Sequence, residues 1–169
     1  MRNPIRDQRN EFLDNLMEWI ARLASQIIED PNYKPSSYWW AKSYPREEPG
    51  VLARAINLVD RVRIVGRGLG YMEVLVPSES KEEESYRVKI EASPLTFDFQ
   101  CTCPHGEHRF NPCKHVVASV LRIVADGYRI KKPKDFFTKN IDGRTVAVAI
   151  HTALNNHAYI KSRIKNIYA

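Results

Sequence analysis

The residues in this sequence that are best suited to bind a metal ion are three cysteines and one histidine grouped in a short stretch. Cys101 and Cys103 form a C-x-C pair, and Cys113 and His115 form a C-x-H pair after nine intervening residues. Three thiolates and one imidazole supply the four ligands of a closed tetrahedral zinc site. A closed site leaves no coordination position for an activated water. The pattern therefore predicts one structural Zn²⁺ ion.

The nine-residue loop between the two pairs holds two further histidines, His105 and His108, either of which is an alternative fourth ligand. We favour His115 because it repeats the one-residue spacing of the first pair. Three cysteines cannot all pair internally, so their clustering predicts metal ligation in a reducing compartment. Buried free cysteines beside surface histidines are the other interpretation, and it requires both pairs to arise by coincidence.

The segments on either side of the cysteines predict how the ligands are positioned. Four stretches with alternating apolar residues precede Cys101 and indicate an antiparallel meander, with Val62 and Ile64, then Tyr71 to Val76, then Tyr86, Val88 and Ile90, then Leu95, Phe97 and Phe99. Apolar residues from Val116 to Ala125 return at helical spacing, and Gly127 suits a left-handed cap. A strand therefore leads into the metal segment, and a helix leads out of it.

The outer segments have separate signatures. Residues 5 to 29 predict an amphipathic helix ended by Asp30 and Pro31, whose apolar stripe we expect on the core rather than on another chain. Residues 31 to 50 contain four prolines and an aromatic group that includes Trp39 and Trp40, so they do not form one regular element. Residues 131 to 142 are turn-rich, whereas 145 to 154 and 158 to 167 have helical patterns.

Together these patterns predict an α+β fold, in which a small antiparallel β-sheet and a zinc-bound strand-turn-helix module are flanked by N-terminal and C-terminal helices. We expect an N-terminal helix and aromatic, proline-rich linker over residues 1–50, a zinc-binding domain over 51–127, and a basic helical extension over 128–169.

The metal segment resembles the SWIM zinc finger family. The resemblance rests on C-x-C-P, the nine-residue loop, C-K-H before an apolar helix, and the Y-x-V-x-I strand from Tyr86 to Ile90. It covers roughly residues 51–127 and implies Cys101, Cys103, Cys113 and His115 as zinc ligands. It also implies DNA binding or protein interaction, as in chromatin factors, transposases and recombination accessory proteins, including partners of RecA-like recombinase paralogues. It implies no catalytic chemistry.

The charge distribution favours a polyanionic partner. The chain of 169 residues has a net charge of +6, and residues 101 to 169 contain 12 Lys and Arg against 4 Asp and Glu. Basic residues attached to a zinc module favour nucleic acid through release of phosphate counterions, and the resemblance implies that this nucleic acid is DNA. A merely solubilising surface is the alternative. The candidate phosphate contacts are Lys114, Arg122, Arg129, Lys131, Lys132, Lys134 and Lys139.

Other function classes receive less support. The chain has no run of about 18 apolar residues, and its first residues lack a secretory signal, so we expect an intracellular protein without a membrane partner. We expect no enzyme activity, because His151 and His157 each stand alone in a predicted helix and no metalloprotease, phosphate-loop or deaminase motif occurs. The second hypothesis is a protein adaptor for DNA recombination or repair, with the N-terminal helix or the Trp39–Trp40 segment as its interface.

Overall fold

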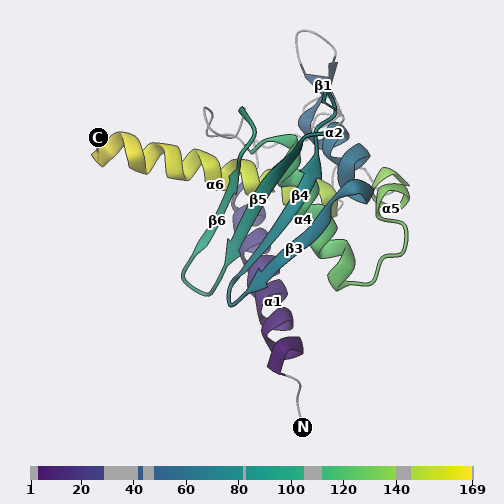
Figure 1. The fold of residues 1–169 in the computed structure, drawn as a ribbon. Helices are drawn as coiled ribbons and strands as arrows, with labels where there is room; N and C mark the ends of the chain where they lie inside the picture. The colour runs from purple at the N-terminus through teal and green to yellow at the C-terminus, as the bar shows by residue number, and fades with distance from the viewer. Residues whose placement is uncertain are drawn as a thin grey trace.

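A computed structural model describes residues 4–28, 42–43, 48–81, 83–104, 112–139 and 146–168 of the chain (Figure 1). The elements are α1 (Pro4–Ile28), β1 (Lys42–Ser43), β2 (Glu48–Pro49), α2 (Val51–Leu58), the 3-10 helix η1 (Val59–Arg61), β3 (Arg63–Gly68), β4 (Tyr71–Pro77), β5 (Ser85–Ala92), β6 (Phe97–Cys101), α4 (Lys114–Gly127), α5 (Pro133–Lys139) and α6 (Val146–Tyr168). The predicted α+β class is confirmed.

The central sheet is an antiparallel meander in the order β3-β4-β5-β6, as the alternating stretches predicted. Met72, Val74 and Val76 of β4 are buried, and the residues between them are half-buried. This alternation places one face of the sheet on the core and leaves the other face polar. On the polar face, Arg87 on β5 donates to Glu73 on β4 at 3.1 Å.

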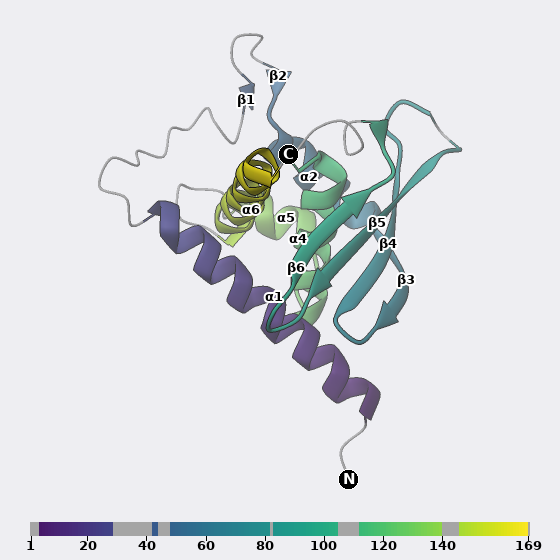
Figure 2. The same ribbon diagram turned by 90° about the vertical axis from the view of Figure 1, so that its left-hand side faces the viewer.

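The helices α1, α4 and α6 lie on one side of the sheet (Figure 2). The central helix is α4, which contacts β4, β5, β6, α1, α2 and α6 and has ten buried residues. Phe12, Leu16 and Ile20 of α1 are buried in the same core, so its apolar stripe packs within the chain as expected. No helix in the described part of the chain is long and apolar enough to cross a membrane.

The structure differs from several local predictions, and one prediction lies outside the described residues. Two short helices, α2 and α5, were not predicted, because segments of eight and seven residues give too short a periodic signal. Both helices pack against α4, a tertiary contact that the local sequence does not indicate. The two predicted C-terminal helices form one continuous helix, α6. Leu95 lies in the turn between β5 and β6 rather than in a strand, and its side chain is 92% exposed. Trp39 and Trp40 lie outside the described residues.

The predicted left-handed cap of α4 lies two residues later than expected. Arg129 has a φ of 57°, whereas Gly127 still belongs to the helix. The Ile130 N–H donates to the Ala125 carbonyl at 2.9 Å, which is the closing bond of a Schellman motif. Glycine at 127 has another role, because a Cβ there would overlap the terminal methyl groups of Leu13 on α1 and the leucine would have to shift. The glycine lets α1 approach the end of α4.

We expect Gly127→Ala to destabilise the protein by about 1 kcal/mol. A glycine-to-alanine change inside a helix normally stabilises by about 1 kcal/mol, but here the new methyl group overlaps Leu13 and overpacking costs roughly 1–3 kcal/mol. Urea unfolding measures the difference. The matched control is Gly127→Ala made in a Leu13→Ala background, where the same methyl group should be stabilising. A stabilising effect in the presence of Leu13 would contradict the close approach of the two helices.

Candidate metal centre

Two elements that are adjacent in space deliver the four candidate ligands. Cys101 is the last residue of β6, opposite Val88 on β5, and Cys103 follows after Thr102. Thr102 holds this turn against β5, because its N–H donates to the Arg87 carbonyl at 3.1 Å and its Oγ1 accepts from the Arg87 N–H at 3.0 Å. The turn between the two cysteines is therefore fixed by the sheet.

The second pair lies at the start of the core helix. Cys113 is the N-cap residue of α4 in an extended conformation, and His115 is the second residue of the helix. The Val117 N–H donates to the Cys113 carbonyl at 3.2 Å, so the first helical turn fixes the position of both side chains. The C-x-H spacing thus places one ligand before the helix and one on its first turn.

The structure brings Cys101, Cys103, Cys113 and His115 together, with every pair of ligand atoms within 4.8 Å. Tetrahedral zinc with Zn–S bonds of about 2.3 Å requires sulfur atoms about 3.8 Å apart, so the cluster needs little contraction to hold the ion. All four side chains are at most 8% exposed. The set is closed by protein atoms, as a structural zinc site requires.

The protonation of the cluster also fits a metal site. A hydrogen bond from Cys101 lowers the pKa of the Cys113 thiol to about 4, and the same hydrogen bond, together with burial, raises the pKa of Cys101. His115 lies close enough to Cys113 to lower the pKa of that thiol further, but neither of its buried ring nitrogens has a hydrogen-bond partner of good geometry among the described residues. A Zn²⁺ ion would engage one of these nitrogens and would replace the shared proton between the sulfur atoms.

These features define a zinc finger with a Cys₃His ligand set, built from a strand end and a helix start. Residues 86–123 match the SWIM zinc finger family, so the chain carries a SWIM zinc finger with one structural zinc ion. The matched stretch runs from Tyr86 on β5 to Ile123 within α4 and lies inside the range of the resemblance seen in the sequence. No curated protein and no solved structure matches the chain.

The seven basic residues proposed as phosphate contacts do not have one common role. Arg122 ties α4 to η1, because its guanidinium donates to the Val59 carbonyl at 3.4 Å and pairs with Asp126 at 3.2 Å. Lys114 pairs with Glu79 at 2.7 Å beside the metal site. Both side chains thus have partners within the chain, and their contact with a nucleic-acid backbone stays a prediction. The side chain of Lys139 lies outside the described residues.

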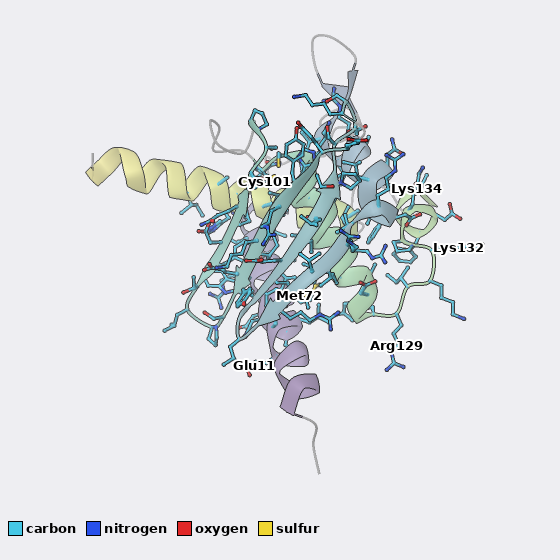
Figure 3. All side chains as sticks on the ribbon, in the orientation of Figure 1. Glu11, Met72, Cys101, Arg129, Lys132 and Lys134 are labelled. Carbon is cyan, nitrogen blue, oxygen red and sulfur yellow. The ribbon has the colours of Figure 1, made fainter. Side chains whose placement is uncertain are left out.

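The other four basic residues lie together in sequence and are exposed. Arg129 and Lys131 follow α4, Lys132 precedes α5, and Lys134 lies in its first turn. Figure 3 shows Arg129, Lys132 and Lys134 on the same side of the molecule. We call these four residues the α4–α5 basic segment. Among the residues that the structure describes, none of them forms an ion pair.

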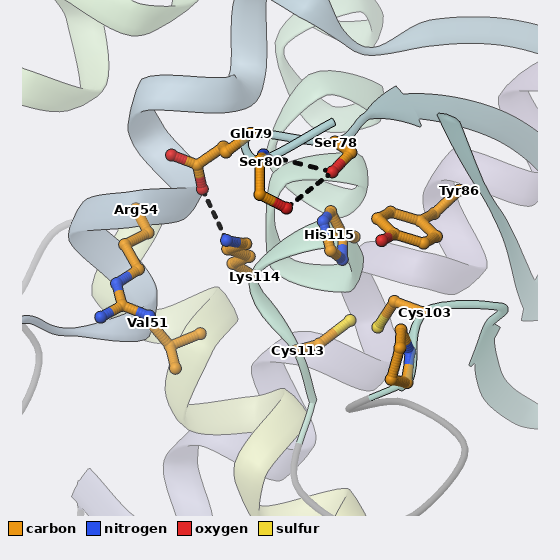
Figure 4. A pocket seen from close by; sticks show the side chains of 11 residues that line it. Val51, Arg54, Ser78, Glu79, Ser80, Tyr86, Cys103, Cys113, Lys114 and His115 are labelled. Atoms are coloured by element: carbon orange, nitrogen blue, oxygen red, sulfur yellow. Dashed lines mark hydrogen bonds and ion pairs between the residues drawn. The ribbon is translucent and has the colours of Figure 1, made fainter. Parts of the chain in front are cut away.

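A pocket of about 220 Å³ borders the metal site and was not predicted from the sequence (Figure 4). Three zinc ligands, Cys103, Cys113 and His115, form part of its wall. Arg54 of α2 and Glu79 of the β4–β5 loop also line it. No spacing rule connects these residues with the cysteines, because they come from elements far apart in the sequence.

His105 and His108 lie outside the described residues, and the two histidines of α6 have structural surroundings. His151 is 5% exposed, and burial lowers its pKa to about 4, so the ring is neutral at physiological pH. The His157 ring packs edge-on against Phe97 and Phe99, with centroids 4.8 and 5.8 Å away. His151 thus lies buried on α6 within 3.1 Å of the Asn155 amide nitrogen, and His157 packs on β6.

Proposed function

We propose that this zinc finger protein binds nucleic acid through the α4–α5 basic segment and has no catalytic activity. The observation that carries the proposal is the exposure of Arg129, Lys131, Lys132 and Lys134 within six positions, without an ion pair in the described part of the chain. Unpaired surface cations release phosphate counterions at little desolvation cost. Their common position favours contact with one stretch of a phosphate backbone.

Two exposed aromatic side chains next to the α4–α5 basic segment are further evidence for nucleic-acid binding there. Tyr128 precedes the basic segment and is 60% exposed, and Phe136 follows it on α5 and is 37% exposed. Exposed aromatic rings between cations are able to stack on unpaired bases. The zinc site helps to position the basic segment, because α4 begins at the Cys113–His115 ligand pair and the basic segment follows the other end of the same helix. We therefore expect single-stranded DNA to bind at least as well as duplex DNA.

Replacing Lys131, Lys132 and Lys134 by Glu should weaken DNA binding by at least about tenfold and reduce the salt slope of log affinity by about three. Fluorescence anisotropy with labelled single-stranded and duplex DNA at several salt concentrations measures both quantities. The matched control reverses Lys81, Arg87 and Lys89, which are basic residues of the sheet region, so the net charge changes equally. Equal losses in the two triple variants, or unchanged binding in the first, would contradict the proposal.

A protein adaptor is the second candidate function, and two leucines favour it. Leu69 is 73% exposed in the β3–β4 turn, and Leu95 is 92% exposed in the β5–β6 turn. The two turns are neighbours, because the Ala92 N–H donates to the Gly70 carbonyl at 2.8 Å. Exposed apolar side chains at adjacent turns suit a protein contact. The family resemblance points to a RecA-like recombinase paralogue as the partner class.

Affinity purification from the native host, with and without nuclease, separates the two functions. An adaptor retains its protein partner after nuclease treatment and loses it when Leu69 and Leu95 are replaced by Asp. If the variant with Leu69 and Leu95 replaced by Asp retained the partner, these two turns would not belong to the interface. A nucleic-acid-binding protein without an adaptor role would lose its associated proteins on nuclease treatment.

A further inference from the structure

The pocket beside the zinc site has the composition of an anion-binding site. Besides the zinc ligands, it is lined by Arg54, Lys114 and the hydroxyl-bearing residues Ser78, Ser80 and Tyr86. Its volume of about 220 Å³ is several times the roughly 30 Å³ that one water occupies in the liquid. We propose that this pocket binds one oxyanion of the phosphate type, with its oxygen atoms facing the non-ligating ring nitrogen of His115 and the side chains of Lys114 and Arg54.

His115 provides the observation that points to a ligand. Its side chain is 5% exposed, it lines the pocket, and neither ring nitrogen has a hydrogen-bond partner among the described residues. One ring nitrogen of His115 would hold a bound Zn²⁺, and the other would then carry a proton. A zinc-bound histidine nearly always donates that N–H to an acceptor. No described side chain or carbonyl supplies that acceptor, and the pocket that His115 lines has room for one.

The orientation of His115 is held by its neighbours. The Tyr86 ring lies against the imidazole with a centroid distance of 4.7 Å, and Figure 4 shows His115 between Tyr86 and the loop that carries Ser78 and Ser80. The Ser78 hydroxyl accepts from the Ser80 and Lys81 N–H groups at 3.3 and 3.2 Å, so this loop is ordered around the pocket. The histidine donor is therefore fixed in place before a ligand binds.

The electrostatics of the pocket favour an anion over a cation. Lys114 and Arg54 contribute two positive side chains. Two helices also begin at the pocket, because Val51 is the first residue of α2 and Cys113 is the N-cap of α4, and both residues line it. Neither helix has an acidic residue in its first turn or a side-chain cap. The partial positive charges of both helix ends therefore add to those of the side chains.

Two negative groups oppose binding and set its strength. A zinc ion with three thiolates has a formal charge of −1. Glu79 pairs with Lys114 at 2.7 Å and lines the pocket, but its side chain is 40% exposed on a loop. An entering oxyanion competes with this carboxylate for Lys114. The site should therefore bind phosphate weakly in the wild-type protein and more tightly once the charge of Glu79 is removed.

Titration of the zinc-loaded full-length protein with inorganic phosphate tests the proposal by calorimetry and by NMR of ¹⁵N-labelled histidine. We expect saturable binding at one site and a shift of the His115 N–H resonance. Glu79→Gln should tighten binding about fivefold, and Lys114→Met should weaken it about tenfold. Lys89→Met is the matched control, because it removes a lysine of β5 that lies outside both the pocket and the α4–α5 basic segment, and it should leave phosphate binding unchanged. Zinc content is measured for every variant.

Absence of saturable binding in both the wild type and Glu79→Gln would overturn the proposal, as would equal losses in Lys114→Met and Lys89→Met. The phosphate source is resolved in the variant with Lys131, Lys132 and Lys134 replaced by Glu, which removes the α4–α5 basic segment. A preference there for a 5′-phosphorylated over a 5′-hydroxyl oligonucleotide assigns the pocket to a nucleic-acid end. Equal binding of the two, with retained phosphate binding, assigns it to a free small anion. The inference is therefore independent of the proposed function.

Discussion

Replacing Cys113 by Ser should abolish zinc binding and lower the free energy of unfolding by about 5 kcal/mol or more. Cys113 joins the N-terminus of α4 to the end of β6 through the metal, and it is 3% exposed. Structural zinc in small fingers contributes roughly 10–16 kcal/mol, as much as the whole stability of an ordinary domain. Metal analysis of the purified, reduced protein and thermal unfolding measure the two effects.

The matched controls are His105→Asn and His108→Asn, which change the two alternative ligands in the loop. Both variants should keep about one zinc per chain and unfold near the wild-type temperature, because His115 completes the cluster. Loss of zinc in either histidine variant, with retention in His115→Asn, would reassign the fourth ligand. A wild-type protein without stoichiometric zinc would overturn the metal site itself.

Leu16→Asp should destabilise the protein by about 4 kcal/mol or more. Leu16 is completely buried within the hydrophobic core, on the helix that packs against α6. Removing a buried leucine side chain costs roughly 2–5 kcal/mol, and placing a carboxylate in the same position adds a desolvation cost. Urea unfolding of the zinc-loaded protein measures the change.

Ala21→Asp is the matched control, because it introduces the same residue on an exposed position of the same helix. It should cost less than about 1 kcal/mol, which reflects helix propensity alone. Comparable effects of the two substitutions would mean that Leu16 does not contribute to the core. Unchanged stability of Leu16→Asp together with loss of a partner protein would instead identify α1 as an interaction surface.

The sequence by itself was sufficient to predict the ligand set, the antiparallel meander and the burial of the α1 stripe. Each of these depends on short-range spacing: C-x-C and C-x-H place donors on one turn and one helix start, and alternation or 3.6-residue periodicity identifies the buried face of an element. The long helix α1 and the strands β4 and β5 gave strong signals because they are regular and amphipathic.

Only the tertiary structure decided what the individual charged residues and glycines do. Arg122 and Lys134 contribute equally to the net charge of the sequence. In the structure, Arg122 donates to backbone carbonyls of η1, whereas the Lys134 side chain is exposed. The sequence predicts Gly127 as a helix cap, but in the structure Gly127 lies within α4, where it leaves room for the Leu13 side chain. The pocket joins Arg54 to Lys114 and His115 across about sixty positions. Such contacts depend on the angles and distances at which helices pack on the sheet, and local periodicity carries no information about them.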